Sequence, residues 1–346
     1  MIGKLVRLAI FVVVLLVGFE LGFEVVLRLI AFGVITVPDD SLFRAYYMNA
    51  EREIISYLPT CARYDQDLTY TLKPGECRFA NREYGTHLQV NSMGLRDDEA
   101  SLQAPEIIVL GDSHAMGWGV QQEDSFPQRL EQASGMKVLN AGVPSYGTAR
   151  ELLLLKRLDT SHLHYLVIQY CNNDDEENAL FLRRGGKQVP MSVADYQQES
   201  ATYRALLPYW PLKYLDYTFG EVQFLLGQWW EKHQGRLPAS ETVLSPDQAV
   251  ERFLAVLAAS GVNLPGVKII VLDMNAVERR SWPFIPALQA RLKSPGQDLP
   301  LMAKGFVAIA IPELADQHYY FNLDDHMNRE GHERVAQALL AIVREE

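Results

Sequence analysis

The chain contains a serine, an aspartate and a histidine that could together carry out nucleophilic catalysis: Ser113, Asp324 and His326. Ser113 follows the apolar run Ile107–Leu110 and a glycine, so we expect it on the turn that leaves a buried strand. A serine hydroxyl needs an imidazole to accept its proton and a carboxylate to orient that imidazole. His326, two residues after Asp324, could supply both from one loop. These residues indicate acyl transfer through a serine nucleophile; the simpler interpretation of the first segment is a polar turn.

Four short blocks, in the same order along the chain, resemble the SGNH hydrolases, also called the GDSL esterase/lipase superfamily. The blocks are GDS at 111–113, VLNAGVPSYG at 138–147, QYCNND at 169–174 and NLDDHMNREGH at 322–332. The resemblance covers the chain from about Glu106 to its C-terminus. It implies a catalytic triad of Ser113, His326 and Asp324. It also implies an oxyanion hole made of the backbone N–H groups of Ser113 and Gly142 and the side-chain amide of Asn173.

Two positions depart from the family pattern. The commonest spacing is D-x-x-H, but the residue three before His326 is Leu323. The acid is therefore Asp324 on the shorter D-x-H spacing, with Asp325 as the alternative. The glycine of the family's GxND block is replaced by Cys171, which leaves Asn173 in place but changes its surroundings.

Apolar runs alternate with helical patterns after Glu106, which predicts an α/β fold with a parallel sheet covered on both faces. Ser113, Gly142 and Asn173 each follow a different strand, so they can meet at the carboxyl edge of the sheet. The resemblance implies a flavodoxin-like three-layer sandwich. The expected strands are Ile107–Leu110, Lys137–Leu139, Tyr165–Tyr170, Val267–Leu272 and Phe306–Ile309, and the expected helices include Thr148–Leu158 and Ser245–Ala259, the latter with Gln248 completing a capping box.

An N-terminal segment, residues 1–37, is apolar over a length that could cross a bilayer. Lys4 and Arg7 precede its apolar run, so the positive-inside rule places the N-terminus in the cytoplasm. We expect a single-pass anchor in the inner membrane, with the catalytic domain in the periplasm. A cleaved signal peptide and an amphipathic interfacial or core helix are the alternatives. Glu20, Glu24 and Arg28 are spaced by four, so they could pair along one helical face, which could also bind a partner.

Residues 38–104 form an extension between the anchor and the hydrolase-like domain. Cys61 and Cys77 could form a disulfide in an oxidising compartment, or could be two unrelated buried thiols. Arg96 belongs to a segment, VNSMGLRDDE, that resembles one preceding the GDS block in membrane-anchored bacterial members. It could reach the site, although a solvated, salt-bridging arginine is the simpler interpretation.

The hydrolase-like domain, 105–346, contains an aromatic-rich insertion at about 175–244. The insertion could be a lid, a glycan-stacking surface, an edge at the membrane interface, or a helical subdomain that packs its aromatic side chains on the core. The last of these is favoured. Its aromatic residues include Tyr203, Tyr209, Trp210, Tyr214, Tyr217, Phe219, Phe224, Trp229 and Trp230. The acidic run Asp174–Glu177 is interpreted as a solvated turn, because it lacks the ligand spacing of a calcium loop.

Three further reactive residues have simpler interpretations than catalysis. Cys171 ends a buried strand and is expected to pack, because no second base is recognisable near it. His332, at the start of the last helix, is expected to be structural. His114 follows the nucleophile and could contact substrate or simply belong to the turn.

The formal net charge of −11 and the lack of a basic stripe argue against nucleic-acid binding. No cofactor or metal motif is recognised. We therefore expect an esterase or deacylase that acts on O-acyl, chiefly O-acetyl, esters of an extracytoplasmic glycan or another cell-surface substrate. The alternatives are an O-acyltransferase that modifies a cell-surface polysaccharide with a multispanning membrane acyltransferase, and a non-catalytic glycan-binding module.

Overall fold

The computed structural model describes residues 2–37, 41–233, 244–274, 283–293 and 305–344. The chain forms two compact units. The first unit joins Met1–Arg52 to Thr202–Val243, and the second joins Glu53–Ala201 to Leu244–Glu346. The units therefore do not follow the consecutive segments expected from the sequence, because the extension and the insertion each contribute to both.

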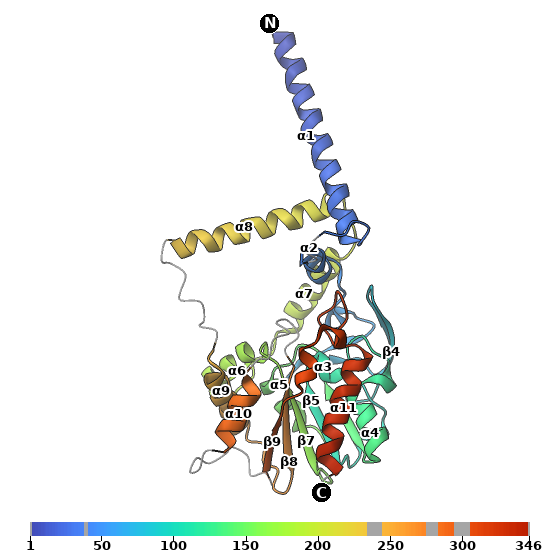
Figure 1. Ribbon diagram of the computed structural model, residues 1–346, viewed down its shortest axis with the longest axis vertical. Coiled ribbons are helices and arrows are strands. Elements are labelled where there is room, and N and C mark those ends of the chain that lie inside the picture. Colours follow the sequence, from blue (N-terminus) through green and yellow to red (C-terminus); the bar gives the residue numbers. More distant parts are fainter. Residues whose placement is uncertain (1, 38–40, 234–243, 275–282, 294–304, 345–346) are drawn as a thin grey trace. The chain divides into compact units, whose positions relative to one another are not determined.

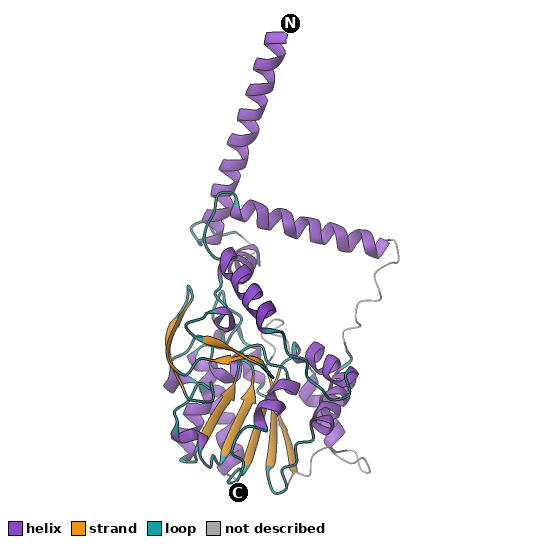
Figure 2. Ribbon diagram, turned by 180° about the vertical axis from the view of Figure 1, so that it is seen from behind, coloured by secondary structure: helices purple, strands orange, loops and turns teal. Residues whose placement is uncertain are grey.

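A five-stranded parallel sheet lies at the centre of the second unit (Figures 1 and 2). Its strands are β5 (Ile107–Gly111), β6 (Val138–Gly142), β7 (Tyr165–Tyr170), β8 (Lys268–Asp273) and β9 (Gly305–Ile309). The spatial order is β6-β5-β7-β8-β9. Strand β5, which comes first in the sequence among the strands of this sheet, therefore lies between β6 and β7, which come second and third. This is a doubly wound order, with its switch point between β5 and β7. The predicted α/β fold with a parallel sheet is confirmed.

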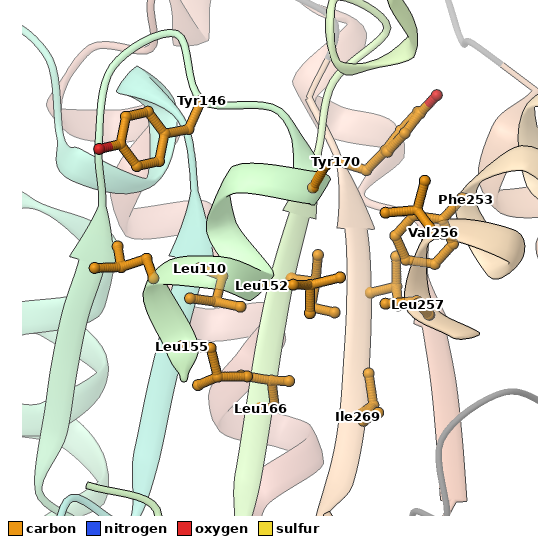
Figure 3. Close-up of a cluster of buried hydrophobic side chains, with 14 of the residues drawn as sticks. Leu110, Tyr146, Leu152, Leu155, Leu166, Tyr170, Phe253, Val256, Leu257 and Ile269 are labelled. Carbon is orange, nitrogen blue, oxygen red and sulfur yellow. The ribbon is translucent and has the colours of Figure 1, made fainter. Parts of the chain in front are cut away.

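Helices cover both faces of the sheet, because successive apolar residues of each strand point to opposite sides. Along β5, Ile108 and Leu110 enter one core, and Ile107 and Val109 enter the other. The first core is covered by α5 (Thr148–Leu155), α6 (Asp174–Arg183), α9 (Pro246–Ser260) and α10 (Phe284–Leu292), and the second by α4 (Phe126–Ser134) and α11 (Arg329–Arg344). Figure 3 shows Leu152 and Leu155 of α5 beside Leu110 and Leu166 of the strands.

Helix α9 begins where its sequence predicts. The Ser245 hydroxyl accepts the backbone N–H of Gln248, and the Gln248 side chain accepts the N–H of Ser245, which completes a capping box. Gly261 ends the helix in the left-handed conformation.

Two antiparallel hairpins precede the sheet. Strands β1 (Ala62–Asp65) and β2 (Thr69–Leu72) form one, and β3 (Gly75–Ala80) and β4 (Gly85–Val90) form the other. Cys61 and Cys77 form a disulfide with 5.2 Å between their Cα atoms, which settles the alternative left open by the sequence. A link across this loop stabilises the fold by about 3 kcal/mol. A third core forms around it and includes Met116 and Trp118.

The first unit contains α1 (Ile2–Ala31), α2 (Ser41–Tyr46) and α8 (Lys213–His233). Helix α7 (Val193–Leu206) contains the sequence boundary between the units. The core of this unit is small and comprises Leu27, Ala31, Tyr46 and Tyr214. Elsewhere, short helical turns occupy Tyr47–Glu51, Ile55–Tyr57, Ala100–Leu102, Ser113–Met116 (α3), Gln122–Asp124, Pro312–Ala315 and Gln317–Tyr319.

The acidic run Asp174–Glu177 is not a solvated turn, and that prediction is wrong. It forms the first turn of α6, where the helix dipole favours negative charge. Asp174 is buried, and its carboxylate accepts a hydrogen bond from the Thr148 hydroxyl. Asp175 and Glu177 each form an ion pair with an arginine. These ion pairs are Asp175–Arg252 and Glu177–Arg150.

The favoured prediction for the insertion, a subdomain that packs its aromatic residues on the core, is wrong for α8. Tyr214, at its start, is fully buried. Further along the helix, four large aromatic side chains are more than half exposed and therefore do not pack on a core. They are Phe219, Phe224, Trp229 and Trp230.

Candidate active site

Ser113 is the first residue of the short helix α3, directly after β5. The turn is tight because Gly111 packs against Gln169 of β7: a Cβ atom on Gly111 would lie 2.5 Å from the Gln169 Oε1 atom. The same Oε1 atom accepts the backbone N–H of Asp112 at 3.0 Å, and the Asp112 carboxylate accepts the N–H of His114 at 2.8 Å. The nucleophile candidate is therefore held from both sides by its own strand and the neighbouring one.

Ser113, His326 and Asp324 lie in hydrogen-bond contact, although Ser113 and His326 are 213 positions apart in the chain. The Ser113 Oγ atom is 2.7 Å from His326 Nε2, and His326 Nδ1 is 2.5 Å from Asp324 Oδ1. Asp325 also approaches Nδ1, at 3.2 Å, but its side chain is 19% exposed, whereas that of Asp324 is fully buried. The geometry therefore favours Asp324 as the orienting acid.

The second carboxylate oxygen of Asp324 is bound by residues outside its own loop. The Tyr84 hydroxyl donates to it at 2.8 Å, and the Trp118 indole N–H donates at 3.3 Å. The loop itself is anchored by Glu83, whose carboxylate accepts the backbone N–H groups of Asn322, Leu323 and Asp324 at 2.8–2.9 Å. Glu83 and Tyr84 lie in the turn between β3 and β4, so the small hairpin layer holds the acid–base loop.

The imidazole of His326 lies against an aromatic ring. Trp118 stacks on it with 4.7 Å between ring centroids and 15° between ring planes. Phe79 of β3 in turn packs edge-on against the Trp118 ring, with 4.7 Å between the ring centroids. This packing leaves the imidazole little freedom to rotate out of line with Ser113.

Two carboxylates raise the pKa of His326 to about 9. Burial alone would lower this pKa, but the charges of Asp324 and Asp325 outweigh it. The two carboxylates therefore favour the protonated form of the imidazole.

The other two histidines near the site have the opposite shift. Burial lowers the pKa of His114 to about 4, and it lowers the pKa of His332 as well. The His332 Nδ1 atom accepts the backbone N–H of Phe126 at the start of α4, which fits the predicted structural role. His114 is buried with its ring centroid 4.8 Å from that of His326, so it is part of the packing beneath the site and not a surface turn residue.

The three predicted oxyanion donors differ in their exposure and in whether they already have a hydrogen-bond acceptor. The Ser113 N–H, at the start of α3, has no acceptor among the described residues, as is usual for the first turn of a helix. Asn173 is exposed at the N-terminal end of α6. The Gly142 N–H donates to the Asn140 side chain at 3.1 Å in this structure, and its part in the oxyanion hole stays a prediction.

Gly142 has a packing role in this structure. A Cβ atom there would lie 2.3 Å from the backbone nitrogen of Met116, so only glycine lets β6 approach α3. Among the described residues, the first N–H after Gly142 that lacks an acceptor is that of Ser145. Ser145 is exposed and has a left-handed φ of 60°.

Arg96 is neither solvated nor in hydrogen-bond contact with the triad, so both sequence interpretations of it are wrong. Its guanidinium is buried and donates to the backbone carbonyls of Met116, the last residue of α3, and of Gly117 and Val120 in the loop that follows. Burial lowers its pKa to about 10. Arg96 thus fixes the segment that carries Trp118.

Sequence reasoning missed four residues that shape the site: Glu83, Tyr84, Trp118 and Gln169. Gln169 opens the QYCNND block, but no role was predicted for it there, and the other three lie outside the four blocks. Each of the four acts on a segment distant in the sequence. The predicted packing role of Cys171 fits its burial, which also raises the pKa of its thiol.

Asp324, Asp325 and His326 are also the one group of described side chains close enough together to hold a metal ion. The 2.5 Å contact between His326 Nδ1 and Asp324 Oδ1 is a hydrogen-bond distance, and Nε2 faces Ser113.

A search against protein-family models finds no match to this chain, and a search of curated proteins finds no similar sequence.

Proposed function

We propose that the protein is a membrane-anchored serine esterase of the SGNH hydrolase type that removes O-acyl groups, chiefly O-acetyl groups, from an extracytoplasmic or cell-surface substrate. The observation that carries the proposal is the continuous chain of contacts from Ser113 through His326 to the buried Asp324. The four sequence blocks and the doubly wound sheet support the same family.

The arrangement suits nucleophilic attack on an ester carbonyl. Neutral His326 accepts the Ser113 proton at Nε2 while its Nδ1–H donates to Asp324. The serine oxygen then bonds to the carbonyl carbon, and the Ser113 N–H and the Asn173 amide are the donors available for the oxyanion. Protonated His326 returns the proton to the leaving alcohol, and water cleaves the acyl-serine in a second round of the same steps.

The proposed location follows from two other features. Helix α1 is long and apolar enough to cross a membrane. Lys4 and Arg7 at its start favour a cytoplasmic N-terminus in the inner membrane. The Cys61–Cys77 disulfide favours an oxidising compartment, such as the periplasm, for the second unit.

The second candidate is an O-acyltransferase that passes the acyl group to a sugar hydroxyl in concert with a multispanning membrane acyltransferase. Glu20 favours it, because this carboxylate is exposed on α1 and ionisable groups in membrane spans usually face a protein partner. A glycan acceptor separates the two candidates: transfer requires the acceptor, and hydrolysis does not.

A fluorophosphonate probe tests the shared chemistry. The full chain should be labelled covalently, and the folded Ser113→Ala variant should not. Release of acetate from a chromogenic ester should then proceed without any glycan. Release that appears only with a glycan acceptor supports the transferase, and a folded chain that neither reacts with the probe nor cleaves esters supports a glycan-binding module instead.

A further inference from the structure

Helix α8 carries a continuous apolar stripe that faces solvent. Its members recur at intervals of three and four residues, which places them on one side of a helix. Each is between 46% and 61% exposed. They are Phe219, Val222, Leu225, Leu226, Trp229 and Trp230.

Polar residues border this stripe. Asp216, Glu221 and Gln223 are exposed there, each three or four residues from a member of the stripe, and the exposed Phe224 lies on the other side of the helix. An exposed apolar stripe with polar borders is stable at a boundary between water and an apolar phase. Large aromatic residues, Trp above all, favour the headgroup region of a bilayer.

Helix α1 marks where such a boundary lies. Every residue from Lys4 to Phe23 is exposed, and at about 1.5 Å per residue this stretch is about 30 Å long, the thickness of a bilayer's hydrocarbon core. Burial within the unit begins at Glu24 and continues with Leu27 and Ala31. One side of α1 therefore becomes buried at Glu24, while Val25 and Val26 on its other side remain exposed.

Helix α8 begins at the same point. The Glu24 carboxylate accepts the backbone N–H groups of Tyr214 and Leu215, at 3.3 Å and 2.8 Å, in the first turn of α8. A carboxylate satisfies the free N–H groups of a helix start and is favoured by the helix dipole there. This contact replaces the pairing of Glu24 with Arg28 expected from the sequence; Arg28 instead stacks over Tyr209, 4.0 Å from its ring centroid.

Within this unit, α8 runs across the end of α1 and not alongside it (Figures 1 and 2). We propose that α8 is an interfacial membrane helix, with its apolar stripe buried among lipid acyl chains just below the headgroups of the extracytoplasmic leaflet. The occupant of the stripe is lipid, bound through apolar burial, since the residues of α8 whose exposure is described include no cluster of exposed basic side chains. The inference rests on the membrane anchor proposed above.

Single cysteines carrying an environment-sensitive fluorophore test this placement in the full chain. The native cysteines interfere little, because two form the disulfide and Cys171 is buried. Leu226→Cys reports on the stripe, Glu231→Cys is the matched control on the opposite side of the same helix, and Leu15→Cys reports on the middle of α1. The chains are reconstituted into vesicles of phosphatidylethanolamine and phosphatidylglycerol whose acyl chains are brominated either near the headgroup or near the bilayer centre.

We expect bromine near the headgroup to quench the label at position 226, at a depth of about 5–10 Å, and to leave the label at 231 bright. Bromine at the bilayer centre should quench the label at 15. If the label at 15 is quenched and that at 226 is not, the anchor stands and the inference is overturned, whether water or protein covers the stripe. If neither is quenched, the anchor and the inference both fail.

Discussion

The turn that carries Ser113 and the loop that carries His326 are held in place in different ways. The turn is fixed by its own neighbourhood: Gly111, the Asp112 cap and Gln169 on the adjacent strand. The loop has local bonds too, such as that from the Phe321 N–H to the His326 carbonyl, but it also depends on Glu83, more than two hundred positions away, which binds three of its backbone N–H groups. Nucleophile and base thus meet at one point but depend on different layers of the fold.

This difference separates the chemistry of the site from its positioning. Damage to the sheet-held turn should remove the nucleophile itself. Damage to the hairpin layer should leave every reactive group present but poorly aligned, and misplacement by about 1 Å can cost about 10²-fold in rate. Variants of the two regions should therefore differ in how much activity survives.

The largest effect is expected for Ser113→Ala. Removing the nucleophile should lower kcat for ester hydrolysis by about 10⁴-fold or more and abolish covalent trapping, because no other group can form the acyl intermediate. Steady-state kinetics and mass spectrometry measure both. Ser161→Ala, at an exposed serine of the same unit, is the control. Full activity in a folded Ser113→Ala chain would exclude the proposed nucleophile.

Asp324→Asn should follow, with a loss of about 10⁴-fold in kcat, because the amide would hold His326 in the wrong tautomer. The neighbouring Asp325→Asn is the matched variant and should lose less than about 10-fold, since its carboxylate is farther from Nδ1 and partly exposed. Equal losses in the two variants, or the reverse order, would move the orienting role to Asp325.

Glu83→Gln tests the hairpin layer directly. Replacing a carboxylate that accepts three N–H groups should loosen the loop and lower kcat by about 10²-fold with a smaller change in KM. Labelling of Ser113 should slow and not disappear. Glu76→Gln, an exposed acid on β3 of the same hairpin, should behave like the parent chain. Unchanged kinetics for Glu83→Gln would show that the loop holds its own shape.

The smallest effect concerns pH. His326 must be neutral to accept a proton, and its pKa is about 9, so kcat/KM should rise as pH increases through about 9. Asp325→Asn removes one of the charges that raise this pKa, so the midpoint should move down by roughly one pH unit. A pH profile of kcat/KM for the two chains measures the shift. A midpoint that stays in place or moves up would contradict the assigned electrostatics.

Much of the sheet was predictable from the sequence because buried parallel strands are short, nearly continuous apolar runs. All five expected strands occur within three residues of their predicted ends, and the capping box of α9 marks its start. The packing of α8 was not predictable in this way. The spacing of its aromatic residues is typical of both a core helix and an interfacial helix. Only the exposure of these side chains in the structure distinguishes the two.

The candidate site was predictable to the extent that its residues carry motifs. Ser113, Asp324 and His326 do, and the structure brings them together. The packing role of Gly142 was not predictable, because only the structure shows that a Cβ atom there would collide with α3. Arg96 was misassigned because an arginine in a polar stretch looks solvated until the carbonyls it binds are known. Glu83 and Tyr84 act only through tertiary contact.

The bond between Cys61 and Cys77 links maturation of this site to the redox state in which the chain folds. The bond lies in the same small core as Phe79 and Trp118, which pack towards His326. A chain made in a reducing expression host should keep its sheet but have a looser hairpin layer, less stable by about 3 kcal/mol. Such a preparation should react more slowly with a serine-directed probe than exported material and recover on reoxidation, so assays of unexported protein would understate its activity.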